Sequence, residues 1–260
     1  MNNILEKICF AKHKHIEDMK EQYSYNDLRK IIDETQLPSA FFSALNRNRG
    51  YAIIAEAKKA SPSKGVIREN FNPVQIAKAY KKAGATCLSV LTDEPFFQGS
   101  DGYLVEVKEE VDIPVLRKDF MIDPYQIFES RALGADCVLL IMAILDDDMA
   151  CRLYETARGL NMDVIVEVHN LREFERAMKL DPRIIGVNNR NLDTMEVSFE
   201  VSRELSMHIP KQCFKISESG IHSFADIEML RSIGYEGFLV GESLMREDDP
   251  GAALGGLLEQ

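Results

Sequence analysis

The stretch GADCVLLIMAILDDDMACRLYETARGLNMDVIVEV, residues 134–168, carries the repeating unit of this chain. Two near-continuous apolar runs, 136–141 and 163–168, flank an amphipathic segment that ends near Gly159. Apolar runs of this length are typical of strands that are buried on both faces, as in a parallel sheet. The stretch therefore predicts a strand, a helix and a second strand parallel to the first.

The same unit recurs from Gly50 onward. Glycines stand just past the helical patterns, as C-cap residues do, at Gly84, Gly134, Gly159 and Gly234. Asn72-Pro73 and Asp123-Pro124 predict helix starts, with a capping side chain followed by proline. The apolar runs lie at 51–56, 86–91, 113–118, 136–141, 163–168, 183–188, 213–217 and 237–241. Eight strands alternating with helices predict a (β/α)8 TIM barrel.

Residues 1–48 precede the first run and follow a different pattern. Apolar residues recur there at helical spacing, at Ile4, Leu5, Ile8, Cys9, Ile16 and Met19. A second helix over 27–36, capped by Asn26, and a third over 40–47 are expected. We predict an N-terminal helical extension (1–48) that packs on the barrel (49–260), together one domain. The rival fold, a doubly wound open sheet, calls for a glycine-rich dinucleotide turn after the first strand, which the sequence lacks.

Composition and charge narrow the classes of function. The chain has 260 residues, 31 Lys plus Arg against 42 Asp plus Glu, and a net charge of −11. This balance argues against nucleic acid and anionic membranes as partners, which need a basic footprint. No apolar run reaches membrane-spanning length, and the start lacks the features of a secretory signal. Five scattered cysteines predict free thiols in the cytoplasm.

The barrel rule places the active site at the carboxyl ends of the strands and in the loops that follow. Charged residues stand at those ends: Glu56, Lys58, Lys118, Glu167 and Glu218. We expect them to face one pocket, within a basic mouth formed by Lys58, Lys59, Lys64, Arg117, Lys118 and Arg190. The histidines show no metal-ligand spacing. His169 shares a strand face with Glu167, and we interpret it as a strand-end histidine at a loop.

Two glycine-containing turns, 217–221 and 240–245, follow the last two strands. Barrels often bind phosphate between these loops, through backbone N–H groups. The loop 61–65 adds a hydroxyl and a lysine near the same rim. Phe96, Phe97 and Phe120 stand in loops, where phenylalanine is typical of a ligand pocket. The pattern predicts a small phosphorylated substrate with a ring at its other end.

Seven segments resemble the indole-3-glycerol phosphate synthase family: 54–65, 89–100, 114–127, 164–170, 184–192, 217–221 and 238–246. They run across the whole barrel in the order that the family has. The resemblance implies ring closure of 1-(2-carboxyphenylamino)-1-deoxyribulose 5-phosphate, with loss of carbon dioxide and water, in tryptophan biosynthesis. It implies that neither a metal nor an organic cofactor is required. We expect a monomer, with other tryptophan-pathway enzymes as candidate partners.

The resemblance also assigns roles. Lys118 resembles the general acid, Lys58 the second catalytic lysine, and Glu167 the partner carboxylate and candidate base, with Glu56, Asn188 and Glu218 orienting them. The residues that resemble the family's phosphate contacts are Ser61, Arg190, Ser219, Gly220, Gly241 and Ser243. The residues that resemble the wall around the substrate ring are Pro62, Phe97, Phe120 and Leu192. The segment Asp101-Gly102-Tyr103 departs from the family and has no interpretation.

Three questions stay open at the level of sequence. Neighbouring carboxylates keep a lysine charged, whereas crowding of Lys58 against Lys118 lowers the pKa of both; the sequence does not decide between these effects. A related barrel, phosphoribosylanthranilate isomerase, is a second reading, but it uses a Cys or Asp acid–base pair, and Cys87 and Cys213 lie inside apolar strands. A binding barrel without catalysis is the third, although none of its expected losses occurs.

Overall fold

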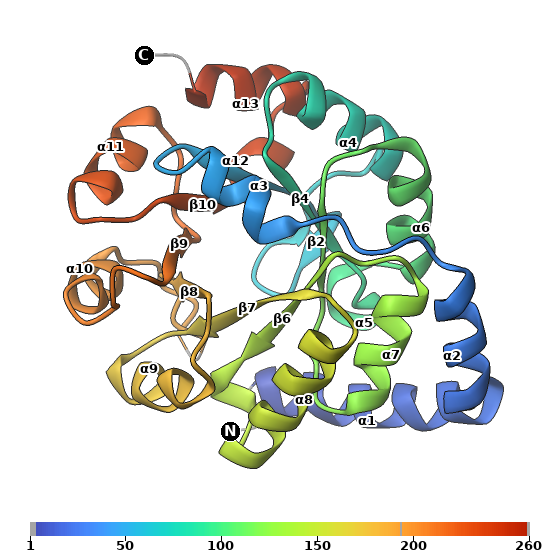
Figure 1. The fold of residues 1–260 in the computed structure, drawn as a ribbon. Coiled ribbons are helices and arrows are strands. Elements are labelled where there is room, and N and C mark those ends of the chain that lie inside the picture. Colours follow the sequence, from blue (N-terminus) through green and yellow to red (C-terminus); the bar gives the residue numbers. More distant parts are fainter. Residues whose placement is uncertain (1–3, 193, 259–260) are drawn as a thin grey trace.

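The computed structural model describes residues 4–192 and 194–258. Within them, eight parallel strands close into a barrel (Figure 1), and β1 completes the ring by pairing with both β4 and β10. The barrel strands are β1 (Ala52–Ala57), β4 (Cys87–Leu91), β5 (Val115–Lys118), β6 (Cys137–Ile141), β7 (Asp163–Val168), β8 (Ile184–Asn188), β9 (Phe214–Glu218) and β10 (Gly237–Val240). The predicted (β/α)8 fold is confirmed. The outermost ends of the predicted extension and barrel, 1–3 and 259–260, lie outside the described residues.

Helices surround the barrel in the predicted alternation (Figure 1). The outer helices are α4 (Pro73–Lys82), α6 (Asp101–Glu110), α7 (Pro124–Ala132), α8 (Asp147–Gly159), α9 (Leu171–Ala177), α10 (Glu200–Ser206), α11 (Phe224–Ser232) and α13 (Pro250–Leu258). Shorter elements that the sequence did not predict lie mostly near the strand ends: β2 (Ala60–Ser61), β3 (Gly65–Val66), α5 (Glu94–Phe97), α12 (Glu242–Met245), η1 (Met142–Ile144) and η2 (Met178–Leu180).

The helix-end predictions are confirmed with two exceptions. Asn72 and Asp123 cap α4 and α7, each followed by proline. Gly84, Gly134 and Gly234 adopt positive φ beyond their helices, and glycine does so without steric cost. Gly159 was wrongly predicted as a C-cap, because it is the last residue of α8 and Asn161 adopts the positive φ of 63°.

The N-terminal extension contains α1 (Ile4–Gln22), α2 (Tyr25–Glu34) and α3 (Phe41–Arg47). Asn26 was wrongly predicted as the cap of α2. The cap is Ser24, because its hydroxyl accepts the N–H of Asp27 while the Asp27 carboxylate accepts the N–H of Ser24. Helix α2 packs against α7, whereas α3 lies at the amino ends of the strands, where the Phe42 N–H donates to the carboxylate of Asp163 at 2.8 Å.

Side-chain alternation along the strands produces two apolar layers. Outward-facing residues such as Val115 and Val166 pack under the helices, and inward-facing ones such as Leu116 and Ile165 fill the barrel. Ile8 of α1 joins the inner layer together with Phe120. Helix α1 therefore lies against the carboxyl ends of the strands, at the barrel mouth.

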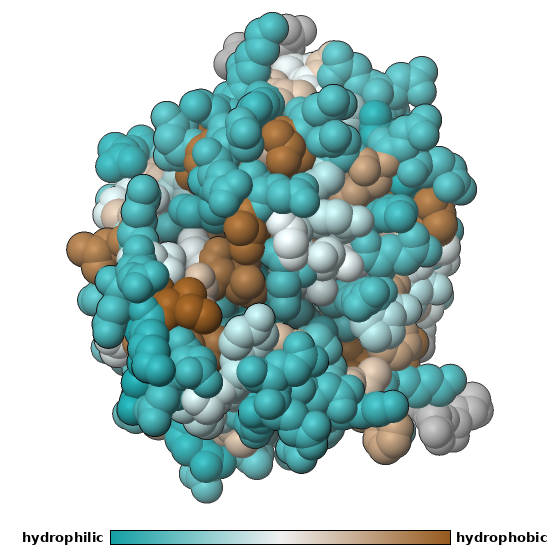
Figure 2. All heavy atoms as spheres, turned by 90° about the vertical axis from the view of Figure 1, so that its right-hand side faces the viewer, coloured by the Kyte–Doolittle hydropathy of each residue, from teal (hydrophilic) through white to brown (hydrophobic). Residues whose placement is uncertain are grey.

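The α1 helix is also held there by charge. Lys12 is buried, and its Nζ lies 2.7 Å from Asp119 and 3.1 Å from Asp93, which follow β5 and β4. The face that carries α2 and α6 is mostly hydrophilic, with apolar side chains in small separate groups (Figure 2). In the described ranges 4–192 and 194–258, none of the helices has the length and apolar character needed to cross a membrane.

Candidate active site

A lysine between two carboxylates occupies the barrel mouth. Lys118 ends β5, and its Nζ lies 2.7 Å from Oε2 of Glu218 and 3.4 Å from Oε2 of Glu167, near the ends of β9 and β7. All three point inward because each shares the face of an inward-facing apolar neighbour two residues earlier. Gly186 on β8 leaves room for Glu218, since a Cβ there would collide with its Oε1.

The charges in this cluster determine whether the pKa of Lys118 is raised or lowered. Burial alone lowers the pKa of Lys118, but Glu218 and Glu167 outweigh it and hold that pKa well above its ordinary value. Burial raises the pKa of Glu167, yet Lys118 and His169 bring it below its usual range. Burial raises the pKa of Glu218 to about 7, against the attraction of Lys118. Lys118 is thus an ammonium ion that faces at least one ionised carboxylate.

Lys58 and Glu56 form the neighbouring pair. The Lys58 Nζ lies 2.6 Å from Oε1 of Glu56, whose side chain is buried at the end of β1. Burial raises the pKa of Glu56, but the charges of Lys58 and Lys118 lower it by more, so the net shift is downward. Gly241 makes this position possible, because a Cβ there would lie 2.5 Å from Oε1 of Glu56.

The end of β8 links the cluster to the following loops. Asn188 donates from Nδ2 to Oε1 of Glu167 at 3.3 Å, and its own Oδ1 accepts the Arg190 N–H at 3.0 Å. Arg190 in turn lies 3.1 Å from Oε2 of Glu242. Asn189 points the other way and donates to the Glu218 carbonyl at 3.0 Å, which joins β8 to β9.

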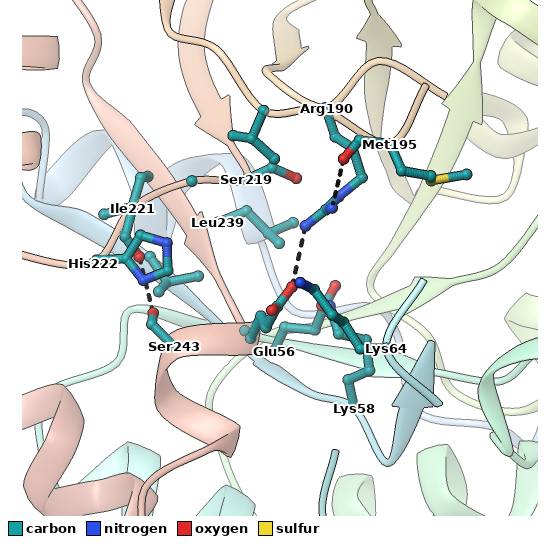
Figure 3. Close-up of a pocket in the computed structure, with 15 residues that line it drawn as sticks. Glu56, Lys58, Lys64, Arg190, Met195, Ser219, Ile221, His222, Leu239 and Ser243 are labelled. Atoms are coloured by element: carbon teal, nitrogen blue, oxygen red, sulfur yellow. Dashed lines mark hydrogen bonds and ion pairs between the residues drawn. The ribbon is translucent and has the colours of Figure 1, made fainter. Parts of the chain in front are cut away.

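A polar cavity of about 390 Å³ opens on one side of Lys58 (Figure 3). Arg190 and Lys64 point into it (Figure 3), and the turn Ser219–Gly220 and the start of α12 also line it. Ser219 and Gly220, which both line the cavity, have positive φ of 69° and 85°. Three cations, Lys58, Lys64 and Arg190, line this one space, which suits an anion, with Glu56 and Glu242 as the present partners of Lys58 and Arg190.

An apolar cavity of about 100 Å³ lies on the other side of Lys58, beneath α1. Phe97 and Phe120 form one wall, with ring centroids 5.9 Å apart. Leu192 and Pro62 line it as well. A central cavity of about 130 Å³, lined by the charged cluster, shares Lys58, Phe97, Phe120 and Arg190 with the apolar one.

The predicted catalytic, phosphate and ring-pocket residues all line one of these three cavities, whereas Lys59 of the predicted basic mouth lines none of them. The polar cavity holds Arg190, Ser219, Gly220, Gly241 and Ser243, and the central one holds Glu56, Lys58, Lys118, Glu167, Asn188 and Glu218. The apolar one holds Pro62, Phe97, Phe120, Leu192 and also Ser61, which the resemblance places on the phosphate side. Ser61 contacts Ser63 at 3.5 Å, between their hydroxyl oxygens.

Arg117 does not belong to the basic mouth, and that prediction was wrong. Its position on β5 alternates with Lys118, so its side chain points outward, where it is fully buried. Its guanidinium lies 2.8 Å from both Asp101 and Glu129. This pairing explains Asp101, whose segment had no interpretation from sequence.

Some lining residues were not predicted. Ile4, Leu5 and Ile8 of α1 line the apolar cavity, and Met195 and Val197 line the polar one. The helical spacing of the α1 residues was visible in the sequence, but it does not reveal which surface the apolar stripe covers.

One group of metal-ligand side chains occurs among the described residues, at the outer edge of α1. Ligand atoms of His15, Asp101 and Glu129 lie within 4.8 Å of one another. Both carboxylates are already paired with Arg117. A cation there competes with a buried guanidinium, so these residues fit a salt-bridge network better than a metal site.

Comparison with known proteins agrees with this geometry. The family model for indole-3-glycerol phosphate synthase matches residues 5–257. The chain belongs to that family. A relative named indole-3-glycerol phosphate synthase from Azospirillum brasilense is 48% identical over 99% of this chain and 100% of its own length. Its namesake in Acidovorax sp. (strain JS42) is 49% identical over 98% of both chains.

Membership of the indole-3-glycerol phosphate synthase family confirms the predicted enzyme class and answers the alternative readings. The isomerase reading called for a Cys or Asp acid–base pair at strand ends. Cys87 is the first residue of β4, and Cys213 lies one residue before β9 and not inside a strand as predicted, so both are buried at the amino ends of the strands, away from the mouth. The reading as a binding barrel needed a lost lysine or carboxylate, and Lys58, Lys118, Glu167 and Glu218 all lie in the mouth.

Proposed function

We propose that this protein closes the indole ring of 1-(2-carboxyphenylamino)-1-deoxyribulose 5-phosphate, with Lys118 as the general acid and Glu167 as the base. The observation that supports it most directly is the ammonium group of Lys118, held by two carboxylates at the junction of a polar and an aromatic cavity. The product, indole-3-glycerol phosphate, makes this a carboxy-lyase of tryptophan biosynthesis.

The cavities fit the two ends of that substrate. The phosphate suits the polar cavity, with Arg190, Ser219, Gly220, Gly241 and Ser243 around it. The carboxyphenyl ring suits the apolar cavity, between Phe97, Phe120, Leu192 and Pro62. The substrate ketone then lies in the central cavity beside Lys118.

Ring closure forms a bond between the ketone carbon and the ring carbon that bears the carboxylate. Negative charge develops on the ketone oxygen, where the Lys118 ammonium group stabilises it and then gives it a proton. The bond to the carboxylate breaks, carbon dioxide leaves, and its electron pair restores the aromatic ring. Lys58, beside Glu56, is placed to hold the carboxylate before it leaves.

Dehydration completes the reaction. The new hydroxyl, which carries the former ketone oxygen, leaves as water when an acid protonates it, and Lys58 is the second acid in reach of the central cavity. A base removes a proton from the adjacent carbon, so that the double bond of the indole forms. Glu167 is suited to be this base because its carboxylate remains ionised and lines the central cavity.

A direct assay tests the activity. The purified chain, given the carboxyphenylamino substrate, should form a fluorescent indole product, and it should leave phosphoribosylanthranilate unchanged. The chain has no Trp, so protein fluorescence does not mask that product. Isomerisation of phosphoribosylanthranilate without indole formation would favour the second family, and tight phosphate binding without turnover would favour a binding barrel.

Arg190 offers a test of the phosphate side. Replacing Arg190 by Met should raise KM about 10-fold to 100-fold, with a smaller effect on kcat, because a charged hydrogen bond to the phosphate contributes about 1.5–3 kcal/mol. Arg246→Met is the matched control, since Arg246 pairs with the same Glu242 but does not line the polar cavity. Equal KM values in both variants would place the phosphate elsewhere.

Three further expectations remain proposals. Free cysteines at positions 9, 87, 137, 151 and 213 support a reducing, cytoplasmic location. Contacts of α1 and α2 with α7 support one domain made of residues 1–48 and 49–260. We also propose a monomer, which sedimentation of the purified chain tests directly.

A further inference from the structure

His169 lies between two carboxylates at the end of β7. Its Nε2 is 3.2 Å from Oε1 of Glu167, and its Nδ1 is 3.0 Å from Oε2 of Glu173. The side chain is only 9% exposed. Carboxylates beside both ring nitrogens favour the charged, doubly protonated ring. Nδ1 is hydrogen-bonded to Glu173, whereas Nε2 meets Glu167 as an ion pair without a hydrogen bond.

Glu173 is itself held in place. Asn170 caps α9 by accepting the Glu173 N–H at 2.9 Å, and its Nδ2 donates to Oε1 of Glu173 at 2.7 Å. The His169 backbone N–H donates to Oε2 of Glu173 at 2.9 Å. The imidazole is therefore hydrogen-bonded to the first turn of α9 through Glu173.

The two oxygens of Glu167 have different partners. Oε1 meets His169 and the Nδ2 of Asn188, whereas Oε2 faces Lys118 at 3.4 Å. A hydrogen bond and an ion pair thus act on Oε1, and Oε2 is the oxygen turned toward Lys118.

The charges around Glu167 determine how much the contact with His169 affects its ionisation. Glu167 also shares the mouth with the acidic Glu218 and Glu56, and the field of both disfavours its ionised form. Lys118 counteracts them, but Glu218 approaches Lys118 more closely, at 2.7 Å. Among the described ion pairs, Lys118 is shared between Glu167 and Glu218, whereas His169 contacts Glu167 and not Glu218.

We propose that His169, supported by Glu173, is a positioning residue that keeps the Glu167 carboxylate ionised and turned toward Lys118. The inference rests on the proposed role of Glu167 as base. Burial lowers the pKa of His169, but the two carboxylates raise it to about 10, so the imidazole is charged across the neutral range. Loss of that charge lets the pKa of Glu167 rise.

The test is the pH profile of kcat/KM for His169→Gln, measured with the carboxyphenylamino substrate. We expect kcat to fall about 10-fold to 100-fold, a part of what a general base contributes. The acidic limb should move up by about one pH unit or more, because an opposite charge no longer stabilises the carboxylate. His208→Asn is the control, an exposed histidine that should leave rate and profile unchanged.

Glu173→Gln provides a second variant that keeps the size and most hydrogen bonds of the side chain. It should shift the acidic limb in the same direction by a smaller amount, because the imidazole loses one of its two carboxylates. A histidine that only supports folding lowers Tm and scales the rate equally at every pH. Unshifted limbs in both variants, with active wild-type protein, overturn the role of His169 alone, whereas inactive wild-type protein overturns the proposed function.

Discussion

Replacing Lys118 by Ala should abolish indole formation, with a loss of roughly a thousandfold or more in kcat. The variant lacks the ammonium group that lies between Glu167 and Glu218, so charge on the ketone oxygen loses this stabilising cation and proton donor. Fluorescence of the indole product measures the loss. Lys118→Arg separates two effects, because arginine keeps the charge but does not readily give up a proton.

The fold should survive this change. Removing a cation from a buried pair normally leaves a costly bare charge. Here burial already brings the pKa of Glu218 to about 7, so without Lys118 that group binds a proton near neutral pH. Circular dichroism and Tm should show a folded variant. Lys59→Ala is the control, since Lys59 lines neither the polar nor the central cavity. Near-normal turnover of Lys118→Ala would contradict the assignment.

The strands and the chemical character of the mouth were predictable because both depend on local patterns. Apolar runs followed by charged residues place Lys118, Glu167 and Glu218 at strand ends, and the barrel topology then brings those ends together. The prediction did not use the alternation of side chains along a strand. Lys118 and Arg117 are adjacent, so both cannot face the mouth, and Arg117 is the one that points outward.

Other features depend on contacts between segments far apart in the chain. The use of α1 as a wall of the apolar cavity depends on Lys12 reaching Asp93 and Asp119, and spacing within α1 does not reveal those partners. His169 carried a local signal, since Asn170 and Glu173 form a helix cap beside it. What sequence could not show is that the other ring nitrogen meets Glu167.

Replacing Arg117 by Met should destabilise the fold by about 3–5 kcal/mol, the cost of breaking a buried ion pair from one side. Its guanidinium lies 2.8 Å from both Asp101 and Glu129 and donates to Ser130 at 3.0 Å. Methionine fills similar volume but leaves those carboxylates without their cation. For a chain of this size the loss corresponds to a fall in Tm of roughly 6–20 °C, measured by calorimetry.

Two comparisons make the result specific. Arg203→Met removes an exposed pair with Glu200 and should change Tm little, because surface salt bridges contribute about 0–1 kcal/mol. Arg117→Lys keeps the charge but not the fork that contacts two carboxylates, so its Tm should lie between those of wild type and Arg117→Met. Asp119 connects this network to Lys12, with 2.7 Å between them, and directly follows Lys118. Arg117→Met should therefore also loosen α1, and an unchanged Tm would mean that the network holds neither the helix nor the strand end.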